Sequence, residues 1–207
     1  MSFSREQILP RLTDLAFRGE EAARVRARAT AGLSGEVLEV GFGSGLTMPF
    51  YPPAVTRVRA VEPSAVARKL AADKVAASAV PVDYVGADAQ ALPLEDVTVD
   101  HVVSIMTLCS IPDAQRALAE IRRVLRPGGA FHFVGHGLSP EETVARWQHR
   151  LTPLQRRLFG GCHINRPIDR LVARAGLELT RLDNYYLNGP RAFGYMFDGV
   201  AAKPRRQ

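Results

Sequence analysis

Three glycines at alternate positions, Gly41, Gly43 and Gly45, follow an apolar run at 37–40, and Phe42 stands between the first two. Such a run is typical of a strand that is buried on both faces. Glycine permits backbone conformations closed to other residues and lets a ligand approach the main chain. In an open α/β sheet, a glycine turn after a strand is a place where nucleotides bind. The pattern favours a nucleotide-like ligand, with a purely structural turn as the alternative.

Two features distinguish this ligand from a dinucleotide. The fingerprint G-x-G-x-x-G requires its third glycine at the position of Leu46, one residue after Gly45. Glu39 stands two residues before the first glycine, and its carboxylate repels a pyrophosphate but attracts a cation. S-adenosylmethionine carries an ammonium, a sulfonium and no phosphate. We therefore predict that S-adenosylmethionine binds here as cofactor and leaves as S-adenosylhomocysteine.

A second acid, Glu62, follows an expected strand at 55–61. It lies about 20 residues beyond the glycine turn, where a βαβ unit places a carboxylate on ribose hydroxyls. The two carboxylate oxygens can accept hydrogen bonds from two neighbouring hydroxyls. Pro63 is next to it, and Ser64 is expected to cap a helix at 64–78. We predict that Glu62 and Pro63 contact the adenosyl part of the cofactor.

The next two strands are expected at 82–85 and 98–106. Asp88 follows the first of them, where a carboxylate can accept the adenine amino group, although an ordinary loop acid is the alternative. The chain leaving the second, at 107–112, should lie across the cofactor beside the first strand. Helices are expected within 5–31 and from 113 to the Pro-Gly-Gly that precedes a strand at 130–134. Because strands and helices alternate, the sheet should be parallel with right-handed crossovers.

The C-terminal third should carry the choice of substrate. We expect a helix at 140–159 that Pro153 interrupts, with Trp147 in the core, and a further helix that ends at Gly176. The last two strands are expected at 177–182 and 192–200, and Arg166 is expected to form an ion pair where a helix begins.

Composition limits the class of protein. A chain of 207 residues, 46% hydrophobic and 23% charged, suits one soluble domain. No apolar run approaches the roughly 20 residues that cross a bilayer, so we expect no stable membrane insertion. Two cysteines favour a reducing cytoplasm. The net charge of +6 comes from scattered arginines with no interleaved aromatics, so nucleic acid is not an expected partner.

The glycine turn, Glu62-Pro63-Ser64, the acid at 88 and the Leu-Arg-Pro-Gly-Gly at 125–129 together resemble the class I S-adenosylmethionine-dependent methyltransferases. The resemblance covers most of 34–136. It implies a Rossmann-like α/β fold with a seven-stranded, mostly parallel sheet whose last strand is antiparallel. It also implies roles for individual residues: Glu39, Gly41 and Gly43 at the methionine end, Glu62 at the ribose, Asp88 and Ala89 at the adenine, and Thr107 and Leu108 along the cofactor.

The chain is then a single domain, 1–207, with a helical lead-in at 1–34, a cofactor-binding half at 35–136 and a substrate-side half at 137–207. A narrower resemblance, to animal thiol methyltransferases with a membrane anchor and their soluble bacterial relatives, rests on Phe50-Tyr-Pro-Pro53, Leu108-Cys-Ser110 and Phe159-Gly-Gly-Cys162-His-Ile-Asn-Arg166. This chain departs from that group in having no N-terminal anchor and in having Gly135, not Glu, before His136.

Methyl transfer to a thiol, oxygen or nitrogen atom of a small apolar molecule is the predicted reaction, with thiols favoured because they ionise near neutral pH. His136 and His163 are the candidate general bases. We expect no metal site, because Cys162 and His163 have no second pair at ligand spacing. The alternatives are an N-methyltransferase of amines or phospholipids and a binding protein that retains the cofactor without turnover. A homodimer is also expected.

Overall fold

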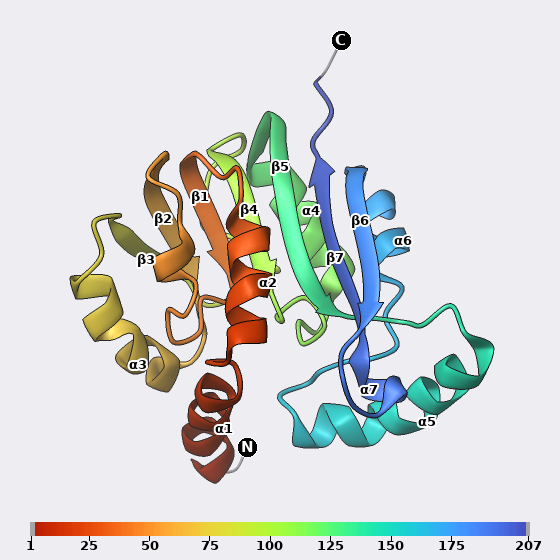
Figure 1. The fold of residues 1–207 in the computed structure, drawn as a ribbon. Helices are drawn as coiled ribbons and strands as arrows, with labels where there is room; N and C mark the ends of the chain where they lie inside the picture. Colours follow the sequence, from red (N-terminus) through yellow and green to blue (C-terminus); the bar gives the residue numbers. More distant parts are fainter. Residues whose placement is uncertain (1–2, 206–207) are drawn as a thin grey trace.

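The computed structural model describes residues 3–205 as one twisted sheet with helices on both faces and at one edge (Figure 1). Within that range the sheet has the strand order β3-β2-β1-β4-β5-β7-β6. The strands are β1 (Gly35–Val40), β2 (Val55–Val61), β3 (Val82–Gly86), β4 (Val99–Ile105), β5 (Leu125–His136), β6 (Glu178–Tyr186) and β7 (Tyr195–Ala202). The helices are α1 (Phe3–Ala16), α2 (Glu20–Thr30), the short 3₁₀ helix η1 (Met48–Phe50), α3 (Ala65–Ala76), α4 (Ala114–Val124), α5 (Glu142–Leu158), α6 (Ile168–Arg174) and α7 (Arg191–Gly194).

The strand order places the topological switch point of the sheet, where the direction of successive connections reverses, between β1 and β4. From β1 the chain proceeds outward to β2 and β3, and β4 returns to the other side of β1. Only β7 runs antiparallel, to β5 on one side and β6 on the other. These observations confirm the predicted seven-stranded sheet with an antiparallel last strand. They also place the ends of β1 and β4 at the crevice where such sheets bind ligands.

The helices follow the apolar pattern of the sequence. On α4, Leu118, Ile121 and Val124 form one fully buried stripe in the same core as Phe131 of β5, as expected of a helix with one apolar face. In Figure 1, α2 covers one face of the sheet and α4 and α6 cover the other, whereas α1 and α5 lie beyond the edge where the parallel strands end. The site described below lies at these carboxyl ends of the parallel strands.

Several expectations about the second half of the chain were wrong in detail. Trp147 is 56% exposed, because the buried face of α5 is formed by Val144, Gln148 and Thr152, one turn apart from each other. Pro153 does not interrupt α5. Its lost hydrogen bond falls on the exposed side of the helix, where water can solvate the freed carbonyl.

The Pro-Gly-Gly segment belongs to β5 and does not precede it, because Gly128 donates to the carbonyl of Lys203, and Lys203 donates to that of Gly129, both at 2.8 Å. The last strand begins at Tyr195, after the short helix α7. Among residues 3–205, no helix is both long enough and apolar enough to cross a membrane.

Candidate functional site

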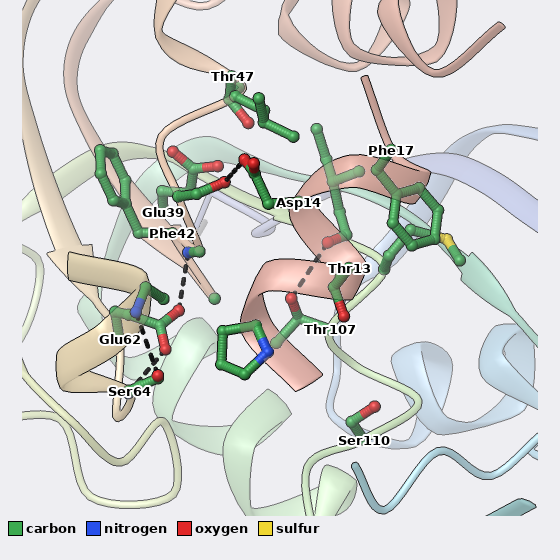
Figure 2. A pocket seen from close by; sticks show the side chains of 18 of the residues that line it. Thr13, Asp14, Phe17, Glu39, Phe42, Thr47, Glu62, Ser64, Thr107 and Ser110 are labelled. Atoms are coloured by element: carbon green, nitrogen blue, oxygen red, sulfur yellow. Dashed lines mark hydrogen bonds between the residues drawn. The ribbon is translucent and has the colours of Figure 1, made fainter. Parts of the chain in front are cut away.

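A cavity of about 360 Å³ opens at the carboxyl ends of β1, β2 and β4 (Figure 2). This volume is within the usual range for small-molecule sites. Its walls come from α1 and the residue that follows it (Pro10, Thr13, Asp14, Phe17), from α2 (Arg26), from β1 and the glycine turn (Glu39, Gly41, Phe42, Gly43, Ser44, Leu46, Thr47), from the end of β2 and the start of α3 (Glu62, Pro63, Ser64, Ala67), from β4 and its exit (Ile105, Met106, Thr107, Ser110) and from Gly160.

The glycine turn has the strained backbone that its composition predicts. Gly41, Gly43 and Gly45 have φ angles of +82°, +58° and +73°, a region that residues with a side chain rarely adopt. At Gly41 a Cβ atom would also lie 2.0 Å from Oγ1 of Thr107. The first glycine is therefore required twice, by its own conformation and by the close approach of the chain that leaves β4.

Glu62 ties the glycine turn to the end of β2. One of its carboxylate oxygens accepts from the backbone N–H of Gly43 at 2.7 Å, and the other accepts from that of Ser64 at 2.8 Å (Figure 2). Each carboxylate oxygen can accept a second hydrogen bond, so the acid remains able to receive the two ribose hydroxyls predicted for it. Its side chain therefore shapes the turn as well as lining the cavity.

Glu39 is a buried acid at the end of β1, with 2% of its surface exposed. Burial raises its pKa to about 7, against the opposing effects of hydrogen bonds from Tyr51 and Thr47 and the positive charge of Arg26. The Tyr51 hydroxyl donates to its Oε2 at 2.7 Å. A cationic group in the cavity would compensate this buried charge, because an opposite charge favours the ionised form of an acid.

The lead-in helix α1 contributes a wall that sequence reasoning did not assign. Asp14 accepts a hydrogen bond from the Ser44 hydroxyl of the glycine turn at 2.5 Å and forms an ion pair with Arg18. Pro10, Thr13 and Phe17 line the same side of the cavity. The sequence predicted helices within 5–31 but carried no signal for these contacts, because they depend on how α1 packs against the rest of the fold.

The chain after β4 lines the cavity only in part. Thr107 borders it as predicted, and Met106 beside it has the unusual φ of +56°. Leu108 points into the apolar core, with 3% of its surface exposed. Asp88 is exposed and accepts from the backbone and side chain of Gln90. Neither Leu108 nor Asp88, nor the buried Ala89, is among the residues that border the cavity, so their contacts with the cofactor stay predictions.

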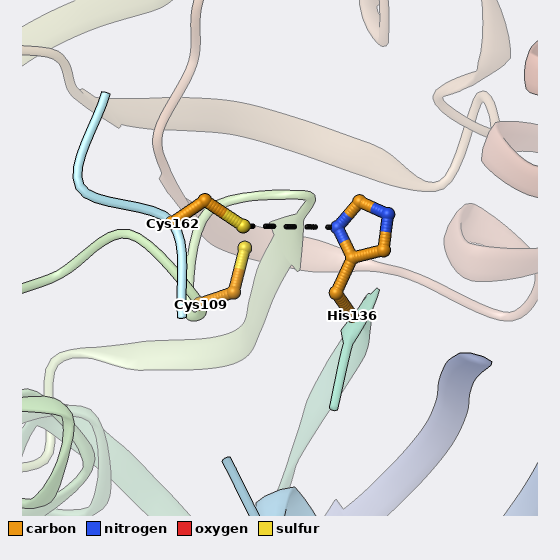
Figure 3. Close-up of side chains that lie close together, drawn as sticks. All are labelled: Cys109, His136 and Cys162. Atoms are coloured by element: carbon orange, nitrogen blue, oxygen red, sulfur yellow. Dashed lines mark hydrogen bonds between the residues drawn. The ribbon is translucent and has the colours of Figure 1, made fainter. Parts of the chain in front are cut away.

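Neither of the two histidines predicted as bases is among the residues that line the cavity. Nδ1 of His163 is 3.2 Å from the carbonyl oxygen of Cys109, and because a carbonyl can only accept, Nδ1 carries the proton in that hydrogen bond. Desolvation, followed by the charge of Arg166, lowers the pKa of His163. Nδ1 of His136 lies 3.9 Å from Sγ of Cys162 (Figure 3). Their catalytic roles stay predictions.

Arg166 is buried and forms no helix-terminal ion pair, contrary to the expectation from the sequence. Its guanidinium donates to the carbonyl oxygens of Leu108 and Ile111, both at 2.6 Å, and to that of Pro112 at 3.1 Å. The side chain therefore fixes the loop that follows β4. A single arginine with three carbonyl partners gives this loop a defined position beside the cavity.

The sheet order, the glycine turn and the acids at the ends of β1 and β2 together define a Rossmann-like S-adenosylmethionine-dependent methyltransferase. A protein family described as "Methyltransferase domain" matches residues 38–133. Human thiol S-methyltransferase TMT1A is 34% identical over 177 residues, which cover 80% of this chain and 72% of the human protein. The chain therefore belongs to the S-adenosylmethionine-dependent methyltransferases and is an enzyme that uses this cofactor.

Two further similarities are informative. Phosphatidylethanolamine N-methyltransferase from Cereibacter sphaeroides is 32% identical over 165 residues, which cover 79% of this chain and 77% of that protein. The structure of a phosphoethanolamine N-methyltransferase from Haemonchus contortus, in complex with phosphomonomethylethanolamine and S-adenosylhomocysteine, superposes with a TM-score of 0.69. It is 15% identical and covers 90% of this chain and 54% of that one, so this likeness concerns the fold.

Proposed function

We propose that this enzyme transfers the methyl group of S-adenosylmethionine to the sulfur of a small apolar thiol. The observation that carries the proposal is the extent of the similarity to human thiol S-methyltransferase TMT1A. It spans 80% of this chain, whereas the general methyltransferase match is confined to residues 38–133. The similarity therefore includes chain outside the cofactor-binding half, and the substrate-side half is where acceptor choice should be determined.

The charges around the cavity support an apolar acceptor. Its ionisable side chains are Asp14 of α1, Arg26 of α2, Glu39 of β1 and Glu62 directly after β2. The two glutamates stand where the cofactor's cationic end and ribose are predicted. The part of the wall that follows β4 is uncharged and consists of Ile105, Met106, Thr107 and Ser110. An acceptor that approaches from this side meets no carboxylate to hold an amine and no arginine to hold a phosphate. An uncharged thiol suits such a wall.

Sulfur also suits the chemistry. Methyl transfer from a sulfonium is an in-line displacement, and correct alignment of the two reactants can supply several kcal/mol of the barrier. A thiol with a pKa near 8.5 is partly ionised at neutral pH, whereas a phenol or an alcohol requires a stronger base. The reaction therefore depends mainly on positioning, which fits a cavity whose wall carries no histidine.

A second candidate function is methylation of an amine or phospholipid head group. It is favoured by the similarity to the phosphatidylethanolamine N-methyltransferase, which covers 79% of this chain. Such a substrate would need a charged subsite, a carboxylate for the amine or a base for the phosphate, and the wall after β4 has no ionisable side chain among the residues that line the cavity. We therefore rank the thiol first.

The test is release of S-adenosylhomocysteine in the presence of alkyl thiols, phenols, primary amines and phosphatidylethanolamine vesicles. We expect kcat/KM to be highest with thiols, by about tenfold or more over the amines, because the amines are protonated at neutral pH. Turnover confined to the vesicles would assign the head-group function. An exposed-residue variant, His149→Gln, should behave as the unaltered enzyme.

A cytoplasmic location and a homodimer are part of the same proposal and rest on the sequence alone. Sedimentation equilibrium measures the second directly. A mass near 22.6 kDa at micromolar concentration would contradict the homodimer.

A further inference from the structure

Two cysteines and one histidine, far apart in the sequence, lie close together in the fold (Figure 3). One potential ligand atom from each of Cys109, His136 and Cys162 lies within 4.8 Å of the other two. Both cysteines are buried free thiols, and His136 is partly exposed. Local spacing could not predict this cluster, because its members come from the loop after β4, the end of β5 and the loop after α5.

Each member is held by the fold. His136 is the last residue of β5 and pairs with Met196 of β7. The carbonyl oxygen of Cys109 accepts from the backbone N–H of His163 at 2.8 Å. Cys162 donates its own backbone N–H to the carbonyl oxygen of Phe159 at 3.1 Å. The side chains therefore converge because backbone hydrogen bonds hold their segments, one of them joining the loop of Cys109 directly to the loop of Cys162.

The distances fit a tetrahedral metal site. Zinc bonds of about 2.3 Å to sulfur and 2.0–2.1 Å to nitrogen place neighbouring ligand atoms roughly 3.5–3.8 Å apart. Here Sγ of Cys162 lies 3.9 Å from Nδ1 of His136, and no pair in the cluster exceeds 4.8 Å. Side-chain rotations that move the ligand atoms by about 1 Å would bring them to the spacing of a bound zinc ion. Two thiolates and one imidazole are the donor set that zinc-like cations prefer over Mg²⁺ or Ca²⁺.

We propose that Cys109, His136 and Cys162 form a three-ligand site for a thiophilic divalent cation of the zinc class. Three protein ligands leave the fourth tetrahedral position open, as in catalytic zinc sites. The cluster adjoins the cavity through its neighbours in the chain, because Ser110 follows Cys109 and lines the cavity, and Gly160 precedes Cys162 by two residues and also lines it. The cation is therefore placed at the acceptor side of the enzyme.

The open position has a use that rests on the proposed function. An acceptor thiol that binds there loses its proton to solvent, because a coordinating thiol is deprotonated. A lone pair of its sulfur then forms the new bond to the donor's methyl carbon. The bond from that carbon to the sulfonium breaks, and its electron pair stays on the donor sulfur as S-adenosylhomocysteine. The product thioether is uncharged and leaves the cation.

The test titrates the metal-free, reduced protein with Co²⁺ or Cd²⁺ and follows the thiolate-to-metal charge-transfer absorption. Cys109→Ser, Cys162→Ser and His136→Gln remove one ligand each, and His149→Gln is the matched surface control. We expect one cation per unaltered chain. Each ligand variant should bind more than about 100-fold more weakly, since loss of even an outer partner of a ligand costs 10- to 100-fold. The control should bind as the unaltered protein does.

Calorimetry with S-adenosylmethionine shows whether each ligand variant is still folded, because the cofactor contacts lie on other residues. Absence of the charge-transfer band in the unaltered protein overturns the site. The site is also overturned if the three ligand variants bind the cation as tightly as the unaltered protein does. A disulfide between Cys109 and Cys162 after mild oxidation, without cation uptake, assigns the pair to redox chemistry instead. Cation binding without thiol turnover refutes the proposed function alone, and thiol turnover without cation binding refutes this site alone.

Discussion

The buried acid Glu39 makes cofactor affinity depend on pH. Its pKa is raised to about 7, mainly by burial. Because the ammonium of S-adenosylmethionine is predicted to pair with this carboxylate, we expect that Glu39 must lose its proton before the cofactor binds well. With a pKa of about 7, the ionised fraction rises from about 0.09 at pH 6 to about 0.76 at pH 7.5, so the contribution of Glu39 to affinity should rise about eightfold across this range.

The assay is isothermal calorimetry with S-adenosylmethionine at both pH values, on the unaltered protein and on Glu39→Gln. The glutamine keeps an oxygen for the Tyr51 hydroxyl and does not titrate, so its affinities report the titration of the ligand's own amino group. The ratio of the two proteins' affinities isolates Glu39. Glu36→Gln is the matched control, because Glu36 lies on the same strand and pairs with Arg59 away from the cavity.

The same residue gives a stability test in the absence of cofactor. An acid whose pKa is higher in the folded than in the unfolded protein binds more protons when folded, so its stability penalty is absent below about pH 4.5 and complete above about pH 7. Glu39→Gln should therefore stabilise the ligand-free protein at pH 8, by up to about 3 kcal/mol, and not at pH 4.5. Urea unfolding measures this. The pH argument as a whole would be refuted if the ratio of the unaltered protein's affinity for S-adenosylmethionine to that of Glu39→Gln stayed constant between pH 6 and 7.5.

Three further substitutions test the site. Gly41→Ala should abolish cofactor binding in calorimetry, because the new Cβ would lie 2.0 Å from Thr107 Oγ1 on a backbone with φ of +82°. Glu62→Ala removes the acceptors of two backbone N–H groups and should lower cofactor affinity by about 10- to 100-fold, with a lower Tm, since such charged hydrogen bonds contribute about 1.5–3 kcal/mol each. His136→Ala should lower kcat at least about tenfold, as expected of a general base or of a ligand of the proposed cation. Cofactor affinity should be retained, because His136 is not among the residues that line the cavity. Unchanged turnover would remove it from the reaction.

Local patterns predicted the cofactor-binding half well. The apolar run before the glycines, the acid at 62 and the alternation of elements are all local signals, and each corresponds to an element that the fold requires. The positive φ angles at the glycine turn follow from the same reasoning. The topology was predictable because right-handed crossovers between parallel strands leave few alternatives.

The rest of the site depends on tertiary packing. Asp14 reaches the glycine turn only because α1 lies across the edge of the sheet. Met106 has a left-handed backbone that its side chain does not favour, so no local pattern could predict it. Cys162 was judged by its spacing to His163, but the fold brings it close to Cys109 and His136, which are far away in the chain. Sequence spacing detects a metal site when one hairpin or helix carries the ligands, and here none does.

The charge of the cavity argues for the donor independently of any similarity. Its ionisable wall residues are three acids, Asp14, Glu39 and Glu62, and one base, Arg26. Two unit charges 4 Å apart interact by about 4 kcal/mol at an effective dielectric constant of 20, so a pyrophosphate beside these acids would be strongly disfavoured. A sulfonium and an ammonium would be attracted by the same groups. The glycine turn therefore provides room for a nucleoside, and the surrounding acids decide that its substituent is a cation.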